Sequence, residues 1–111
     1  MNVEARKLAI ADYKKRTSVA GIYVIRNLAT GEAWVGPALD IEKIQNRIWF
    51  SLRMGGHKNS DLQRAWATHG EAGLSFEIVE QLKDEELPYI RDALLKERLA
   101  HWRAALNGAL A

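Results

Sequence analysis

Basic side chains and large aromatic rings are interleaved in the middle of the chain. The basic residues of this stretch, with its histidine, are Lys43, Arg47, Arg53, His57, Lys58 and Arg64. Three aromatic residues lie among them: Trp49, Phe50 and Trp66. Cationic side chains bind phosphates and aromatic rings stack on bases, so this stretch predicts a nucleic-acid-binding surface.

Two of these rings have different predicted positions. Trp66 shares a helical stripe with Leu62, which predicts that it packs in the core. Phe50 projects away from the stripe formed by Ile44 and Ile48, so we expect it on the surface. An exposed ring at this position suits a homodimer contact as well as a nucleic acid.

The composition excludes several kinds of binding site. The formal net charge is only +2, so the distribution of basic residues, and not their total, carries the signal. Cysteine is absent, which excludes disulfides and thiolate zinc sites. His69 and His101 have no partner at metal-ligand spacing, and we assign them no ligand role.

The length of 111 residues predicts one domain over 1–111 with a single core. The charged N-terminal segment is not typical of a secretory signal, and no apolar run is long enough to cross a membrane. We therefore expect a cytoplasmic protein with no membrane partner.

The first half of the chain predicts two strands followed by two helices. Residues 3–15 form an amphipathic pattern, which predicts an N-terminal helical extension over 1–16. The runs 19–25 and 33–36 are rich in β-formers and flank a turn at 27–32, which predicts a hairpin. Asp40 is the expected N-cap of a helix over 41–54, and Ser60, preceded by Asn59, is expected to cap a shorter helix that ends at His69-Gly70.

The second half predicts one strand and the longest helix. Residues 74–80 mostly alternate apolar and polar side chains, as a strand does. Acidic residues at 84–86 and Pro88 indicate a helix start, and Asn107-Gly108 indicates its end. These elements predict an α+β fold with a three-stranded, largely antiparallel sheet flanked by helices.

Several motifs resemble those of one nuclease family. Gly21-Ile22-Tyr23 and Trp34-Val35-Gly36 resemble the paired tripeptides that name the GIY-YIG family. The stretch 55–80 is similar to the family's run G-x-H-x-N, L-Q-x-A-W, G, F-x-F-E. The resemblance covers about residues 21–107, and its middle block is the more specific part.

The resemblance implies an endonuclease-like domain that hydrolyses nucleic-acid phosphodiesters, with DNA as the expected substrate and Mg²⁺ or Mn²⁺ as the cofactor. Such hydrolysis needs a metal, a group that helps to deprotonate water and a cation that stabilises the transition state. By this resemblance, Tyr23 orients or activates the water, Arg47 is the cation and Glu97 is the metal ligand. Lys43, Arg53, His57, Lys58 and Arg64 are the expected nucleic-acid-binding residues.

Three positions depart from the family pattern or leave an alternative open. Trp34 replaces the second tyrosine, and its indole can donate a hydrogen bond but cannot accept a proton. Counting without gaps places Ile44 at the arginine position, with Arg47 one turn further along and Arg53 as the fallback. Asp92 competes with Glu97 as the metal ligand.

Two hypotheses follow. The first is a magnesium-dependent endonuclease; the second is a catalytically degenerate member that binds nucleic acid or protein. Ordinary structural roles stay open for the site residues: a core position for Tyr23, and solvated surface positions for Arg47 and Glu97. Catalysis requires that the Tyr23 phenol and the Glu97 carboxylate converge on one solvent-lined pocket.

Overall fold

The computed structural model describes residues 19–82 and 87–111. Its elements are β1 (Gly21–Asn27), β2 (Ala33–Ala38), α2 (Ile44–Arg53), α3 (Ser60–His69), the 3-10 turn η1 (Glu71–Gly73), β3 (Leu74–Gln81), α4 (Pro88–Leu106) and β4 (Ala109–Leu110). The helix predicted over 3–15 and the acidic segment at 84–86 lie outside the described residues.

The strands form one sheet in the order β3-β1-β2-β4. β1 pairs antiparallel with both β2 and β3, while β4 pairs in parallel with β2. The predicted α+β class and hairpin are confirmed, but the sheet has four strands and not three. β4 was missed because a two-residue strand is too short to show an alternating pattern.

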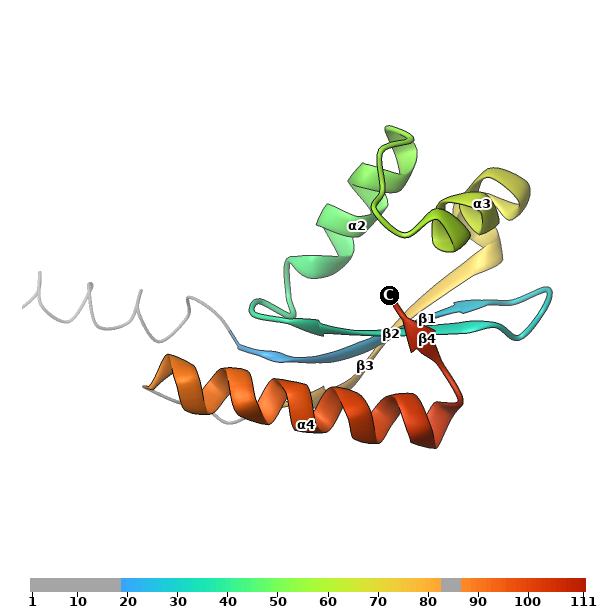
Figure 1. The fold of residues 1–111 in the computed structure, drawn as a ribbon. Coiled ribbons are helices and arrows are strands. Elements are labelled where there is room, and N and C mark those ends of the chain that lie inside the picture. Colours follow the sequence, from blue (N-terminus) through green and yellow to red (C-terminus); the bar gives the residue numbers. More distant parts are fainter. Residues whose placement is uncertain (1–18, 83–86) are drawn as a thin grey trace, which may run out of the picture.

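Helices cover both faces of this sheet. Figure 1 shows α2 and α3 on one side and α4 on the other. β1 contributes side chains to the apolar clusters on both faces of the sheet, because successive side chains of a strand point in opposite directions. Tyr23 and Ile25 join the cluster under α2 and α3, whereas Ile22 and Val24 join the cluster under α4.

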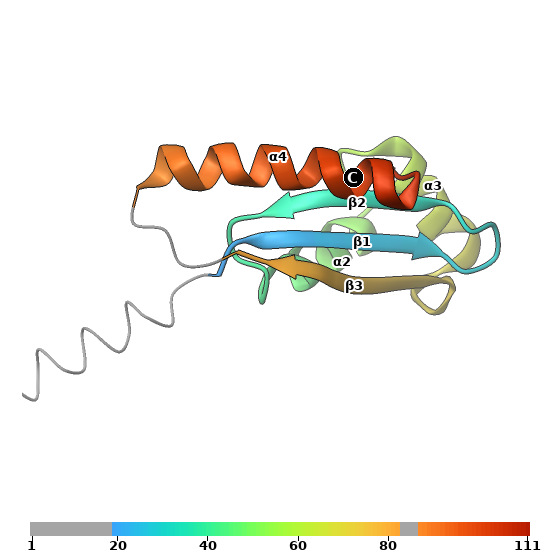
Figure 2. The same ribbon diagram turned by 90° about the horizontal axis from the view of Figure 1, so that it is seen from below.

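Seen from below, α4 runs along the sheet (Figure 2). It packs through Leu95, Leu99, Trp102 and Leu106, which recur at three- and four-residue spacing. Glu80 of β3 joins the helix to the sheet, because its carboxylate accepts hydrogen bonds from Arg98 Nε at 2.8 Å and Trp102 Nε1 at 2.7 Å.

The helix starts differ in part from those predicted. α2 begins at Ile44 and not at residue 41, because Asp40 organises a preceding turn: its side chain accepts from the Glu42 amide at 3.2 Å. Asn59 is the N-cap of α3 and accepts from two amides of its first turn. α4 begins at Pro88, where a missing amide proton costs nothing, and ends at Asn107 in the left-handed conformation.

Among the described residues, none of the helices has the combination of length and apolar character needed to cross a membrane.

Candidate nucleic-acid interface

A hollow of about 400 Å³ opens beside α2 and the loop that follows it. Its lining residues are Ile44, Arg47, Ile48, Ser51, Gly56, His57 and Lys58. It brings together three of the predicted site residues, Arg47, His57 and Lys58. No acidic side chain of the described residues lines it, and its charged side chains, Arg47 and Lys58, are cationic.

The local sequence explains why these residues meet. Ile44, Arg47, Ile48 and Ser51 lie three and four positions apart and therefore share one face of α2. Gly55 follows the helix with a φ of 77°, a conformation that suits glycine. The chain turns there, so that residues 56–58 complete the wall of the hollow.

His57 is held from two directions. Its Nδ1 lies 2.7 Å from the Ser51 hydroxyl of α2. Its backbone amide donates to the side-chain oxygen of Gln63 on α3 at 3.1 Å. Gln63 in turn donates to the Leu52 carbonyl at 3.0 Å, which ties the loop to the end of α2. Burial lowers the pKa of His57, which favours the neutral imidazole.

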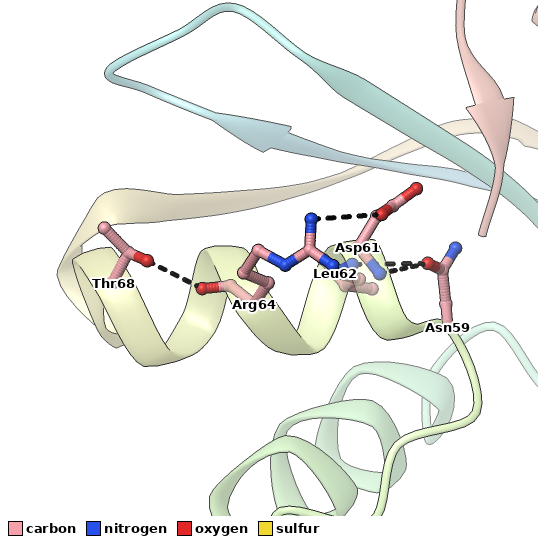
Figure 3. A network of polar contacts seen from close by, with 5 residues as sticks. All are labelled: Asn59, Asp61, Leu62, Arg64 and Thr68. Atoms are coloured by element: carbon pink, nitrogen blue, oxygen red, sulfur yellow. Dashed lines mark hydrogen bonds and ion pairs between the residues drawn. The ribbon is translucent and has the colours of Figure 1, made fainter.

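The other predicted phosphate-binding residues lie outside this hollow. Lys43 is 4.0 Å from Asp40, and Arg53 is 3.7 Å from Glu71. Arg64 turns back along α3 towards Asp61 at 3.9 Å (Figure 3). It lines a separate, smaller hollow of about 170 Å³ between α3 and the β1–β2 turn. The basic stretch is therefore divided: Arg47, His57 and Lys58 line the first hollow, Arg64 lines the second, and Lys43 and Arg53 line neither.

Tyr23 lies on the same sheet face as α2 but does not line the hollow. Its ring is buried and stacks on Phe76, with ring centroids 5.3 Å apart. Burial raises the pKa of Tyr23 to about 12, so its phenol stays protonated at neutral pH. Trp34 is buried in the same cluster.

Glu97 does not line the hollow beside α2. It is exposed on α4, two positions from the inward-facing Leu95 and Leu99, and so points away from the sheet. Because α4 covers the face opposite to Tyr23, the expected convergence of Tyr23 and Glu97 on one pocket is wrong. The spacing of apolar residues along a helix indicates which side of the helix is buried, but not which face of the sheet the helix covers.

Among the described residues, the hollow beside α2 contains no ligand for the predicted divalent metal. Hard cations require oxygen ligands, yet the hollow offers no carboxylate. No group of three or more histidine, aspartate and glutamate side chains in residues 19–82 and 87–111 could hold a metal ion. Asp92, the alternative ligand, is paired with Arg91 at 3.2 Å.

Phe50 and Trp66 occupy the predicted environments, whereas Trp49, which was predicted among the rings that stack on bases, is buried in the core. Phe50 is 62% exposed on α2. Trp66 packs against the core and makes an edge contact with Trp49, with ring centroids 5.6 Å apart. The rings of Trp49 and Trp66 therefore support the helices, and Phe50 is the one ring of the three that remains on the surface.

Sequence reasoning missed Ser51 and Gln63 as site residues. Ser51 falls on the same helical face as Arg47, a spacing that could have indicated it. Gln63 belongs to the motif run Leu62-Gln63-Arg64-Ala65-Trp66, so its position was visible although its bond to the His57 backbone was not.

Comparisons with known proteins identify similar sequences and structures. No protein-family model matches the chain. The intron-associated endonuclease 1 of Enterobacteria phage T4 is 34% identical over 91 residues, which are 82% of this chain and 34% of that protein. The chain thus spans about a third of the length of this curated relative.

Two solved structures have a similar fold. A mutant of the catalytic domain of intron endonuclease I-TevI has a TM-score of 0.68 and 32% identity, covering 80% of this chain and 84% of that chain. The catalytic domain of homing endonuclease I-TevI has a TM-score of 0.67 and 33% identity, covering 79% of this chain and 88% of that chain.

Proposed function

Because this chain belongs to the GIY-YIG endonuclease family, we propose that it binds a nucleic-acid backbone in the hollow beside α2 and hydrolyses a phosphodiester there. DNA is the expected substrate, as the resemblance to homing endonucleases suggests. The observation that supports this most strongly is the meeting of Arg47, His57 and Lys58 in one hollow free of acidic lining residues.

The proposed chemistry uses the residues of the hollow. Arg47 and Lys58 bind phosphate oxygens and stabilise the negative charge that develops in the transition state. The water oxygen bonds to phosphorus as His57 takes its proton, and the bond from phosphorus to the leaving sugar oxygen breaks. The leaving oxygen then accepts a proton from the histidine or from solvent.

Tyr23 has a narrower role in this proposal than the family resemblance implies. With a pKa of about 12 its phenol is a poor base near neutral pH, because it remains protonated. Its buried ring supports the sheet face beneath α2 through Phe76. Any direct contribution to catalysis is therefore limited to donating a hydrogen bond.

A second candidate function is binding without hydrolysis. Two observations favour it: Trp34 stands where the family has a tyrosine, and the hollow has no carboxylate that could hold a divalent cation. Binding requires only Arg47 and Lys58, so it survives the loss of catalytic groups.

Cleavage and binding assays on the full chain distinguish the two functions. Plasmid DNA, branched DNA and RNA are incubated with magnesium, manganese or a chelator, and binding is measured by fluorescence anisotropy at several salt concentrations. We expect Arg47→Ala and Lys58→Ala each to weaken binding and to lower the salt dependence by about one counterion.

Arg53→Ala is the matched control, because Arg53 lies on the same helix but outside the hollow. Cleavage that His57→Ala abolishes supports the hydrolase, whereas salt-sensitive binding without cleavage supports the second candidate. Failure of both assays, or an equal effect of Arg53→Ala, would contradict both proposals.

A further inference from the structure

We infer that Ser51 is a positioning residue that fixes His57 in the Nδ1–H tautomer and so leaves Nε2 as its acceptor nitrogen. The inference concerns a residue that neither the family motifs nor the basic pattern indicates. Its consequence for catalysis rests on the proposed function, but the tautomer itself is measurable without a substrate.

The hydrogen bonds of Ser51 determine the direction of its contact with His57. The Ser51 hydroxyl lies 2.9 Å from the Ile48 carbonyl and 2.7 Å from His57 Nδ1. In the first of these bonds Ser51 is the donor and the carbonyl can only accept, so we assign the single hydroxyl proton of Ser51 to Ile48. The oxygen then has only lone pairs for the histidine, and Nδ1 must carry the proton that joins them.

The neutral imidazole has one protonated and one unprotonated ring nitrogen. With the proton on Nδ1, the lone pair is on Nε2, and this nitrogen can accept a proton. The other tautomer would place a donor at Nε2, which cannot act as a base. Ser51 thus selects the form of His57 that the proposed reaction needs.

Other contacts keep the ring in place. Gln63 accepts the His57 backbone amide at 3.1 Å and is itself anchored to the Leu52 carbonyl. Ser51 lies in the last part of α2, whose position is fixed by the buried residues Ile48 and Leu52. The His57 ring is therefore hydrogen-bonded to α2, and the His57 backbone is hydrogen-bonded to α3.

The surroundings of His57 also favour the neutral ring. Burial lowers its pKa, and the cationic side chains that share its hollow are Arg47 and Lys58. In the proposed reaction, the neutral nitrogen accepts a proton from the attacking water, and the two cations bind the phosphate.

Nitrogen-15 NMR of the full chain tests the tautomer directly. Two-bond proton–nitrogen correlations distinguish a protonated from an unprotonated ring nitrogen, and His57→Gln assigns the signals among the three histidines. We expect His57 to have a protonated Nδ1 in the wild type. Ser51→Ala should shift the ring towards the Nε2–H form that free histidine prefers.

Ser51→Thr is the conservative control, since a threonine hydroxyl in a helix can make the same bond to a preceding carbonyl. It should retain the Nδ1–H signature. If the wild type cleaves nucleic acid, Ser51→Ala should lower kcat on the order of tenfold with little change in KM, and Ser51→Thr should restore the rate.

Two results would overturn the inference. One is an Nε2–H tautomer in the wild type, or an Nδ1–H tautomer that persists in a folded Ser51→Ala protein. The other is an unchanged kcat in a Ser51→Ala variant whose tautomer has shifted. A protein that does not bind or cut nucleic acid would contradict the proposed function alone, because the NMR result does not depend on substrate.

Discussion

At the scale of single residues, Gly36 and Tyr23 pack closely against each other. Gly36 lies in β2 opposite Tyr23, and a Cβ at this glycine would lie 2.4 Å from the Tyr23 hydroxyl and 2.6 Å from its Cζ atom. Because the ring itself is too close, removal of the hydroxyl alone would not make room. The contact with Tyr23 therefore explains why position 36 requires glycine, an explanation that the sequence alone did not provide.

We expect Gly36→Ala to lower the free energy of unfolding by about 1–3 kcal/mol, because Tyr23 must move in a close-packed core. Urea denaturation followed by circular dichroism measures the loss. Gly56→Ala is the control, since its added methyl meets no atom within 4 Å and its φ is not positive. Equal stability of Gly36→Ala and the wild type would refute this steric explanation.

Asn59 combines two contacts in one side chain. Its oxygen accepts from the amides of Asp61 at 3.0 Å and Leu62 at 3.2 Å, while its nitrogen donates to the Leu110 carbonyl of β4 at 2.9 Å. It therefore caps α3 and connects that helix to the last strand.

Replacing Asn59 separates these two effects. Asn59→Ala should lose both and cost about 1 kcal/mol or more of stability. Asn59→Asp should keep the cap but lose the donor to Leu110, which predicts greater hydrogen exchange at β4 with α3 unchanged. Thermal denaturation and amide exchange measure these changes; identical exchange at β4 in the Asp variant and the wild type would contradict the second role.

At the scale of elements, one carboxylate joins β3 to α4. Burial of Glu80 opposes its ionisation, but hydrogen bonds from Trp102 and Arg98 and the positive charge of Arg98 outweigh burial and lower the pKa of Glu80. The ionised carboxylate is favoured in the folded protein, so its contribution to stability is present above the ordinary glutamate pKa of 4.5. That contribution is lost as the pH falls through the lowered pKa.

We expect Glu80→Gln to reduce stability by about 1 kcal/mol at neutral pH, because the charged acceptor is removed. The difference from the wild type should shrink as the pH falls below 4.5, since the wild-type carboxyl then becomes neutral as well. Urea titrations at several pH values measure it. Glu77→Gln is the control, because Glu77 forms an exposed pair with Arg26; a pH-independent difference for Glu80→Gln would contradict this explanation.

At the scale of the whole molecule, two apolar layers share one sheet. Leu62 belongs to the layer under α2 and α3, and Leu95 to the layer under α4. β1 contributes buried residues to both, so loss of either layer exposes the same strand. The described part of the chain should therefore unfold as one cooperative unit.

Leu62→Ala and Leu95→Ala test this cooperativity. Each removes a buried side chain and should cost about 2–5 kcal/mol. Circular dichroism and tryptophan fluorescence should report the same unfolding midpoint in each variant, as in the wild type. A second transition that appears in only one variant would show that the layers unfold separately.

The sequence alone determined the local features of this protein. The turn at 27–32, the spacing of apolar residues in α2, and a helix cap at residues 59–60 each depend on neighbours within a few positions, and the motif run 55–80 indicated the family. The start of α2 was missed because Asp40 prefers to form a turn, and β4 because its two residues pair only with β2.

Only the tertiary structure decided which of the candidate residues meet. Arg47 and His57 share a hollow because Gly55 turns the chain back after α2, whereas Glu97 faces solvent behind the sheet because α4 packs on the opposite layer. A side chain's spacing along a helix determines its face relative to neighbours in that helix. The packing of that helix on one face of the sheet or the other depends on contacts between residues distant in sequence, which no local pattern records.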